Sequence, residues 1–214
     1  MAKTTAPLLS FGASGALAQA MVFATWRGIS YVRRYVVPEN PRTAAQTLTR
    51  DIFRTLSDMW KVMGSIAIAP WQTFAISKPL TDRNAMMGKN IASLRGDVNM
   101  NNFIGSPAAR GGLAPDGVVA VAGVGTITIT FTNPAPPTGW TLVAAQAIAF
   151  PDQAPEAALV GPVTEAEDAA SPFDTVVLTG LGAVLHQCSC WLKWTKPDGL
   201  VAYGASINVT ETPA

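Results

Sequence analysis

The second half of the chain consists of short apolar runs of strand length, and this pattern constrains the fold more than any other feature of the sequence. From Gly117 onward such runs occur at residues 118–123, 126–132, 140–150, 173–181, 183–195 and 200–210. Turn-forming stretches such as NPAPPTG and KPDG separate them, and the run TITITFT alternates polar with apolar residues as a half-buried strand does. The sequence therefore predicts an all-β sandwich over residues 117–214.

The number and spacing of these strands are typical of an immunoglobulin-like or fibronectin type III-like sandwich. The turn from Lys196 to Gly199 joins the last two strands as a predicted hairpin. Two hallmarks of immunoglobulin domains are missing, because no pair of cysteines can bridge two sheets and no tyrosine corner can be placed. The exact strand topology is therefore left open by the sequence.

The first half begins with a predicted β-hairpin. Strand-like runs at residues 17–26 and 29–37 flank a tight turn at Arg27 and Gly28. In the second run, Tyr31, Arg33 and Tyr35 share one face, and Arg34 lies on the other.

Two or three helices are predicted to follow the hairpin. Asn40 as N-cap with Pro41 at the first helical position predicts a helix that ends at Gly64. A second, short helix is predicted from about residue 70 to 77, and a third begins after the cap Thr81 and ends before Gly96. Asn84 and Asn90 within the third helix are expected to hold neighbouring backbone.

The first predicted helix is amphipathic. Its apolar stripe, which should face the core, comprises Leu48, Ile52, Phe53, Leu56, Met59, Trp60 and Met63. The opposite stripe carries Gln46, Arg50, Arg54, Ser57 and Lys61. This basic stripe is either solvated or in contact with a partner.

Together these patterns predict an α+β N-terminal module followed by the all-β sandwich. Residues 1–96 form the N-terminal arm, hairpin and helices, and residues 1–16 are expected to be held by contacts with other subunits. Residues 97–116 have no hydrophobic period and predict a linker, in which Phe103 and Ile104 are candidate anchors.

The charge distribution favours contacts with partners. Only 14% of the residues are charged, which is well below the usual quarter. Residues 1–114 contain 13 Lys and Arg against 5 Asp and Glu, a net of +8, whereas residues 115–214 contain 2 against 9, a net of −7. Opposite charges of this kind could pair between the two halves or between neighbouring copies, so self-association is expected.

Residues 26–46 are the segment densest in arginine and aromatic residues. Guanidinium groups between aromatic rings can stack and can pair with carboxylates or phosphates. The alternative is that the aromatic residues pack the hairpin while the arginines are solvated. The candidate partner-binding residues in and near this segment are Trp26, Arg27, Tyr31, Arg33, Arg34, Tyr35, Arg42, Arg50 and Arg54.

No arrangement of residues predicts catalysis, a metal or a cofactor. His186, Cys188 and Cys190 alternate along one predicted strand, but structural zinc usually requires four converging ligands, so core packing is the preferred interpretation. The glycine-rich stretches match no phosphate-binding motif. Glu165, Glu167 and Asp168 are predicted to lie in a solvated acidic loop. We therefore do not expect an enzyme.

The compartment follows from the cysteines and the apolar runs. Cys188 and Cys190 are expected to be free thiols, which is consistent with synthesis in a reducing cytoplasm. The N-terminus imitates a signal peptide, but Gly12, Ser14 and Gly15 interrupt its apolar run, so cleavage is not expected. No run of 18 apolar residues predicts a membrane span.

Four motifs carry a resemblance to a known group of proteins. They are RRYVxPxNPRTxxQ from Arg33 to Gln46, LTDRNA from Leu80 to Ala85, NxxxLR from Asn90 to Arg95, and SPxxxGGL from Ser106 to Leu113. They resemble a group of poorly characterised tailed-bacteriophage proteins encoded among virion structural genes. The similarity covers roughly residues 5–114, and the β half is similar only in general character.

The resemblance implies a virion structural protein, made in the host cytoplasm and located in the virion. We expect a head decoration or stabilisation (cement) protein whose partners are the major capsid protein or other virion subunits. A tail or neck structural protein is the alternative. A nucleic-acid-binding accessory protein is a further alternative, which the acidic second half and the lack of a DNA-reading motif make less favoured.

Overall fold

A computed structural model describes residues 15–214, except positions 18, 28, 38, 77 and 98. The chain divides into two compact units, residues 1–42 and 43–214. The sequence led us to expect boundaries near residues 96 and 116 instead. The difference arises because the helices share a hydrophobic core with the β half, as described below.

The first unit is a three-stranded antiparallel sheet in the order β1 (Gly15–Leu17), β2 (Met21–Trp26) and β3 (Ile29–Arg34). Trp26 pairs with Ile29, which gives the two-residue connection predicted from the sequence. Arg27 within this connection has a φ of +49°, as tight hairpin turns require. Strand β1 was not predicted, and most of the expected N-terminal arm lies outside the described residues.

Helix α1 (Ala44–Val62) begins later than the sequence predicted. Thr43 is its N-cap residue, and Asn40 and Pro41 precede the helix. The cause is local, because Arg42 has a φ of +44°, which is incompatible with a helix that starts at Pro41. Most of the predicted apolar stripe faces the core, but Phe53 does not: 49% of its surface is exposed.

Helix α2 (Ser65–Ala75) also differs from the prediction, because it begins five residues before Pro70 and contains that proline. Its first backbone N–H groups are satisfied from far along the chain. The Glu165 carboxylate accepts hydrogen bonds from the backbone N–H of Gly64 and from that of Ile66, the latter at 3.2 Å. Such a cap cannot be read from local sequence.

Helix α3 (Asp82–Leu94) has the predicted start, since the Thr81 hydroxyl accepts a hydrogen bond from Asn84 N–H at 3.3 Å. Asn90 is fully buried, and its amide holds neighbouring backbone as expected. It donates to the carbonyls of Met86 and Ile104 and accepts from Ile104 N–H at 2.7 Å. Asn84 is exposed.

The predicted linker at residues 97–116 is packed into the second unit. It contains a short 3-10 helix, η1 (Met100–Asn102), followed by Phe103, which is fully buried with its ring edge against Phe150 at 5.1 Å between centroids. Ala109 and Tyr203 exchange backbone hydrogen bonds of 2.9 and 3.1 Å. The anchoring role predicted for Phe103 is confirmed, whereas the extended arm is not.

Two antiparallel sheets follow. One has the order β4 (Asp116–Gly123), β5 (Thr126–Thr132) and β8 (Thr175–Thr179). The other has the order β10 (Val201–Tyr203), β9 (His186–Thr195), β6 (Thr141–Pro151) and β7 (Thr164–Asp168), and β11 (Ile207–Glu211) also pairs with β9. The hairpin predicted at residues 196–199 joins β9 to β10. The prediction of an acidic loop at residues 164–172 is wrong, because the first part of this segment forms strand β7.

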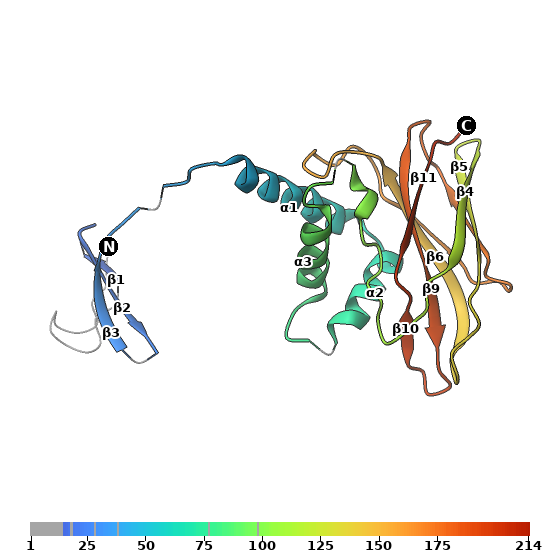
Figure 1. Ribbon diagram of the computed structural model, residues 1–214, viewed down its shortest axis with the longest axis horizontal. Helices are drawn as coiled ribbons and strands as arrows, with labels where there is room; N and C mark the ends of the chain where they lie inside the picture. Colours follow the sequence, from blue (N-terminus) through green and yellow to red (C-terminus); the bar gives the residue numbers. More distant parts are fainter. Residues whose placement is uncertain (1–14, 18, 28, 38, 77, 98) are drawn as a thin grey trace. The chain divides into compact units, whose positions relative to one another are not determined.

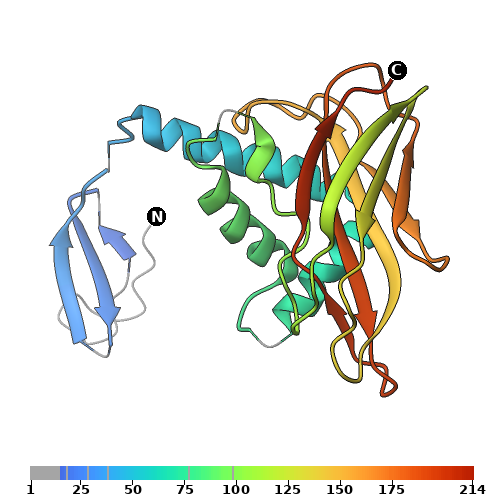
Figure 2. The ribbon, with the colours of Figure 1, turned by 45° about the vertical axis from the view of Figure 1, so that its right-hand side comes forward.

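The β6–β9 sheet lies between the helices and the β4–β5–β8 sheet (Figures 1 and 2). One core joins Ile148, Phe150 and Trp191 of this sheet to the helices, and the other joins Ala147, Cys190 and their neighbours to the second sheet. Strands β6 and β9 are therefore buried on both faces, which explains their nearly continuous apolar sequences.

Candidate partner-binding surface

The candidate residues of the hairpin lie together on the first unit, and they are largely exposed. Trp26 exposes 63% of its surface and Tyr31 42%, while Arg33 and Arg34 lie on the edge strand β3. The Arg27 guanidinium lies 4.9 Å from the centre of the Trp26 ring. Tyr35 is half-buried, and its backbone N–H donates to Ala20.

The described part of the first unit has little interior of its own. None of the side chains described between residues 15 and 42 is buried. Its exposed apolar side chains are Met21, Trp26, Tyr31, Val32, Val36 and Val37. A small sheet whose described side chains are all at least partly exposed gains little free energy of folding from them, so this surface suits contact with another molecule.

The remaining candidate residues are separated from this group along the chain. Arg42 is exposed at the last position of the first unit. Arg50 and Arg54 lie on α1 in the second unit, where Arg54 pairs with Asp51 at 3.1 Å. The predicted site therefore consists of an aromatic and basic group on residues 26–35 and a basic group on α1.

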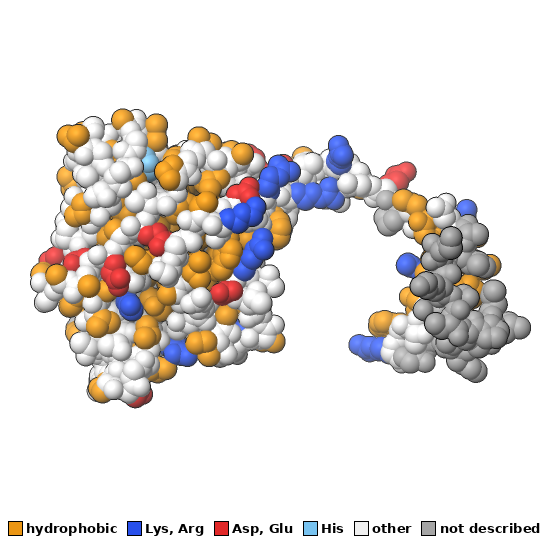
Figure 3. All heavy atoms as spheres, turned by 180° about the vertical axis from the view of Figure 1, so that it is seen from behind, with side chains coloured by type: hydrophobic (Ala, Val, Ile, Leu, Met, Phe, Trp, Pro, Cys, Tyr) orange, Lys and Arg blue, Asp and Glu red, His pale blue; other side chains and the backbone are white. Residues whose placement is uncertain are grey.

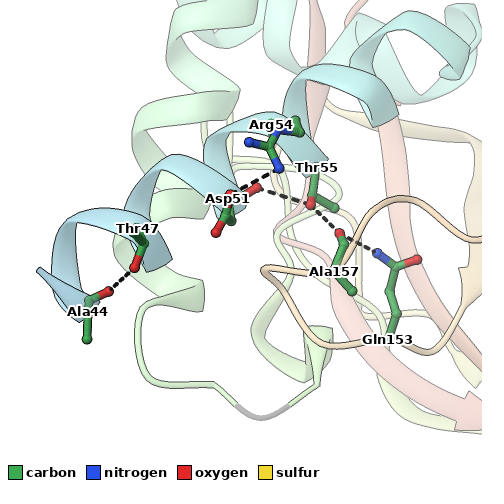
Figure 4. Close-up of polar contacts among 7 residues, drawn as sticks. All are labelled: Ala44, Thr47, Asp51, Arg54, Thr55, Gln153 and Ala157. Carbon is green, nitrogen blue, oxygen red and sulfur yellow. Dashed lines mark hydrogen bonds and ion pairs between the residues drawn. The ribbon is translucent and has the colours of Figure 1, made fainter. Parts of the chain in front are cut away.

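A hydrogen bond on the inner side of α1 fastens this helix to the loop after β6 (Figure 4). The Thr55 hydroxyl donates to the carbonyl of Ala157 in the loop after β6, and Gln153 Nε2 donates to the same carbonyl at 3.4 Å. Arg54 and its partner Asp51 belong to the exposed part of the helix, and 69% of the Arg54 side chain is exposed. The Thr55 contact and the buried apolar stripe of α1 leave its basic residues on the outer side of the helix.

The outer side of α1, together with Ile91 of α3, lines an open hollow of about 530 Å³, which we call the α1–α3 groove. It is lined by Thr49, Arg50, Phe53, Arg54, Ser57, Asp58 and Lys61 of α1 and by Ile91 of α3. Figure 3 shows Lys and Arg side chains gathered near the start of α1, with hydrophobic atoms beside them. Sequence reasoning identified Arg50 and Arg54 but assigned Phe53 to the core.

Glu165 and Glu167, from the predicted acidic loop, make structural contacts. Glu165 caps α2, as described above. Glu167 accepts a hydrogen bond from Gln146 Nε2 at 3.0 Å and lies 3.7 Å from the Lys193 ammonium. Gln146 in turn accepts from Trp191 Nε1 at 2.9 Å. These carboxylates therefore fasten the helices and strands to one another.

His186 and the cysteines pack inside the sandwich, as expected. All three are buried, and both thiols are free. Burial raises the pKa of each thiol to about 12, and the neighbouring Cys190 and Glu211 also raise the pKa of Cys188. Protonated thiols are poor nucleophiles and poor metal ligands. In the described part of the chain no group of three or more His, Cys, Asp or Glu could hold a metal ion.

No known protein-family model matches the sequence, and no curated protein matches it significantly. Among the described residues, no helix combines the length and apolar character that a membrane crossing requires.

Proposed function

We propose that the chain is a structural protein of a tailed-bacteriophage virion, and that it decorates or stabilises the head. The observation that carries this proposal is the first unit, a small basic sheet with exposed aromatic and aliphatic side chains and no described side chain that is buried. The resemblance of four sequence motifs to those of tailed-bacteriophage virion proteins supports the assignment to a virion.

The first unit has the properties of a segment that is buried against neighbouring subunits. Its apolar side chains gain free energy when covered, at about 25 cal/mol per Å² removed from water. Strand β3 is an edge of its sheet, so a strand of another subunit can pair with it. Arg33 and Arg34 lie on this edge and can pair with carboxylates of that subunit.

We further propose that the β sandwich is immunoglobulin-like. When its strands are lettered in chain order, with β10 and β11 as two parts of the last strand, β4, β5 and β8 take the places of A, B and E. Strand β9, which pairs with the last strand, takes the place of F, and β6, on the other side of β9, takes the place of C. Strand β7 pairs with β6, which is the place of C′ in variable-type domains.

The double variant Arg33→Glu with Arg34→Glu tests the role of the first unit. Particles assembled with it should contain less of the protein or should break at lower temperature, because the edge strand would then repel carboxylates. The matched control is Arg83→Glu with Lys89→Glu, which reverses two exposed charges on α3. Normal incorporation and normal particle stability in the Arg33/Arg34 variant would refute the proposal.

The alternative location in the tail or neck uses the same contacts, so it is decided by copy number. Hundreds of copies per particle favour the head or the tail tube, and a dozen or fewer favour the neck or the tip.

The basic residues of the first unit also favour a second candidate function, nucleic-acid binding. That function requires affinity for duplex DNA that falls steeply as salt is raised, and absence of binding at low salt would exclude it.

A further inference from the structure

We propose that the α1–α3 groove binds an acidic amphipathic helix of a partner protein. This inference concerns the second unit alone and does not depend on the assignment to a virion. It rests on the shape of the groove, an exposed aromatic ring and the arrangement of charges.

The groove is elongated along α1. A second hollow of about 490 Å³ shares Thr49 and Arg50 with it and extends to Ala45 and Arg95. The two hollows together follow α1 from Ala45 to Lys61, which at 1.5 Å per residue is roughly 24 Å. This length matches a helix of about 16 residues.

The groove has an apolar part. About half of the Phe53 surface is exposed, and the half-buried Ile91 of α3 lines the groove together with it. The carbon stems of Arg50, Arg54 and Lys61 extend the apolar surface, because long basic side chains keep only their charged ends in water. A partner helix with apolar residues at i, i+3 or i+4, and i+7 can cover such a strip.

The charges favour a protein over a nucleic acid. Arg50, Arg54 and Lys61 line the groove and Arg95 lies at its far end, so acidic side chains along the margin of the partner helix would find cations. Asp51 and Asp58 lie among them, at 3.1 Å from Arg54 and 2.8 Å from Lys61. A phosphate backbone is uniformly negative and would meet both carboxylates, whereas a helix can place carboxylates opposite the cations alone.

The experiment starts by selecting binders to the full-length chain from a displayed library of random peptides of about 20 residues. The selected peptides should contain Glu or Asp together with Leu or Phe at helical spacing. One of them is then synthesised, labelled and titrated with the protein, and fluorescence anisotropy reports its affinity.

Phe53→Ala and Arg54→Glu should each weaken this affinity about tenfold or more, because the residues that contribute most to binding are often aromatic rings and arginines. The matched controls are Val62→Ala and Arg83→Glu, at exposed positions outside the groove, and they should change the affinity less than about twofold. Thermal unfolding of every variant shows that the fold is kept.

Three outcomes overturn the proposal. The first is that no peptide is enriched, and the second is that the enriched peptides lack acidic residues or helical spacing. The third is that binding is unchanged in both groove variants. Duplex DNA or anionic vesicles that bind in a manner sensitive to Arg54→Glu, in the absence of a selected peptide, would identify the groove as a polyanion site instead.

Discussion

A single carboxylate, that of Glu165, accounts for two of the differences between the sequence-based expectations and the structure. The sequence predicted Glu165 in a solvated loop and predicted that the second helix starts near Pro70. In the structure strand β7 places this carboxylate at the first turn of α2, so the helix can start at Ser65. Neither feature is visible locally, because the two residues of each contact are about a hundred positions apart.

Glu165→Gln should destabilise the protein by about 1 kcal/mol, because it removes a negative charge from a helix N-terminus and weakens two hydrogen bonds. The measurement is the free energy of unfolding from urea titrations. Glu156→Gln, at an exposed position, is the control and should have no measurable effect. Equal stability of the two variants would contradict the capping role.

The two buried thiols should make the protein less stable in alkali. In the unfolded chain they ionise near pH 9, whereas in the folded chain they keep their protons until about pH 12. Above pH 9 the unfolded state therefore binds fewer protons, and the free energy of unfolding falls by up to about 1.4 kcal/mol per pH unit for each thiol.

The comparison that isolates this effect is with Cys188→Ala and Cys190→Ala combined. The variant will be less stable at neutral pH, but its stability should fall less steeply between pH 9 and 12. The slopes are obtained from urea titrations at several pH values. Parallel slopes for the two proteins would show that the thiols are not protected.

At the scale of elements, local periodicity predicted most helices and strands, and long-range packing decided the rest. The alternation in TITITFT predicted β5 with its bounds, and Thr81 predicted the start of α3. Phe53 has the spacing of a core residue yet lies at the margin of the buried stripe, since the position of α3 determines which residues are covered. Residues 97–116 lack any period because individual side chains anchor them, so they were interpreted as a linker.

Phe103→Ala should therefore destabilise the second unit strongly, by about 3–5 kcal/mol, because it removes a fully buried ring that packs against Phe150. A residue in a true linker would not have this effect. Leu113→Ala is the control within the same segment, since its side chain is exposed and it contacts Trp194 through its backbone carbonyl. Thermal and urea unfolding give the stability of both variants. A loss of less than about 1 kcal/mol in the free energy of unfolding for Phe103→Ala would contradict the packed arrangement.

At the scale of the whole molecule, the charge asymmetry of the sequence does not coincide with the structural boundary. The net charge of the sequence changes from positive to negative near residue 114, whereas the first structural unit ends at residue 42. The helices are basic on their outer side but apolar toward the β6–β9 sheet, and this packing assigns them to the second unit. The charge of a segment therefore predicted which surfaces are basic or acidic, whereas the buried contacts determined where one structural unit ends and the next begins.

Removal of residues 1–42 should leave the second unit folded, because both hydrophobic cores consist of residues after position 43. Its thermal midpoint should stay within a few degrees of that of the full chain, and its far-ultraviolet circular dichroism should keep the helical signal. The deleted segment contains five Lys and Arg and one Glu, so the net charge should change from +1 to −3. Incorporation into particles should be lost if the first unit makes the contacts proposed for it, while a peptide selected for the α1–α3 groove should bind with unchanged affinity. A truncated chain that unfolds at a much lower temperature would show that the first unit stabilises the second.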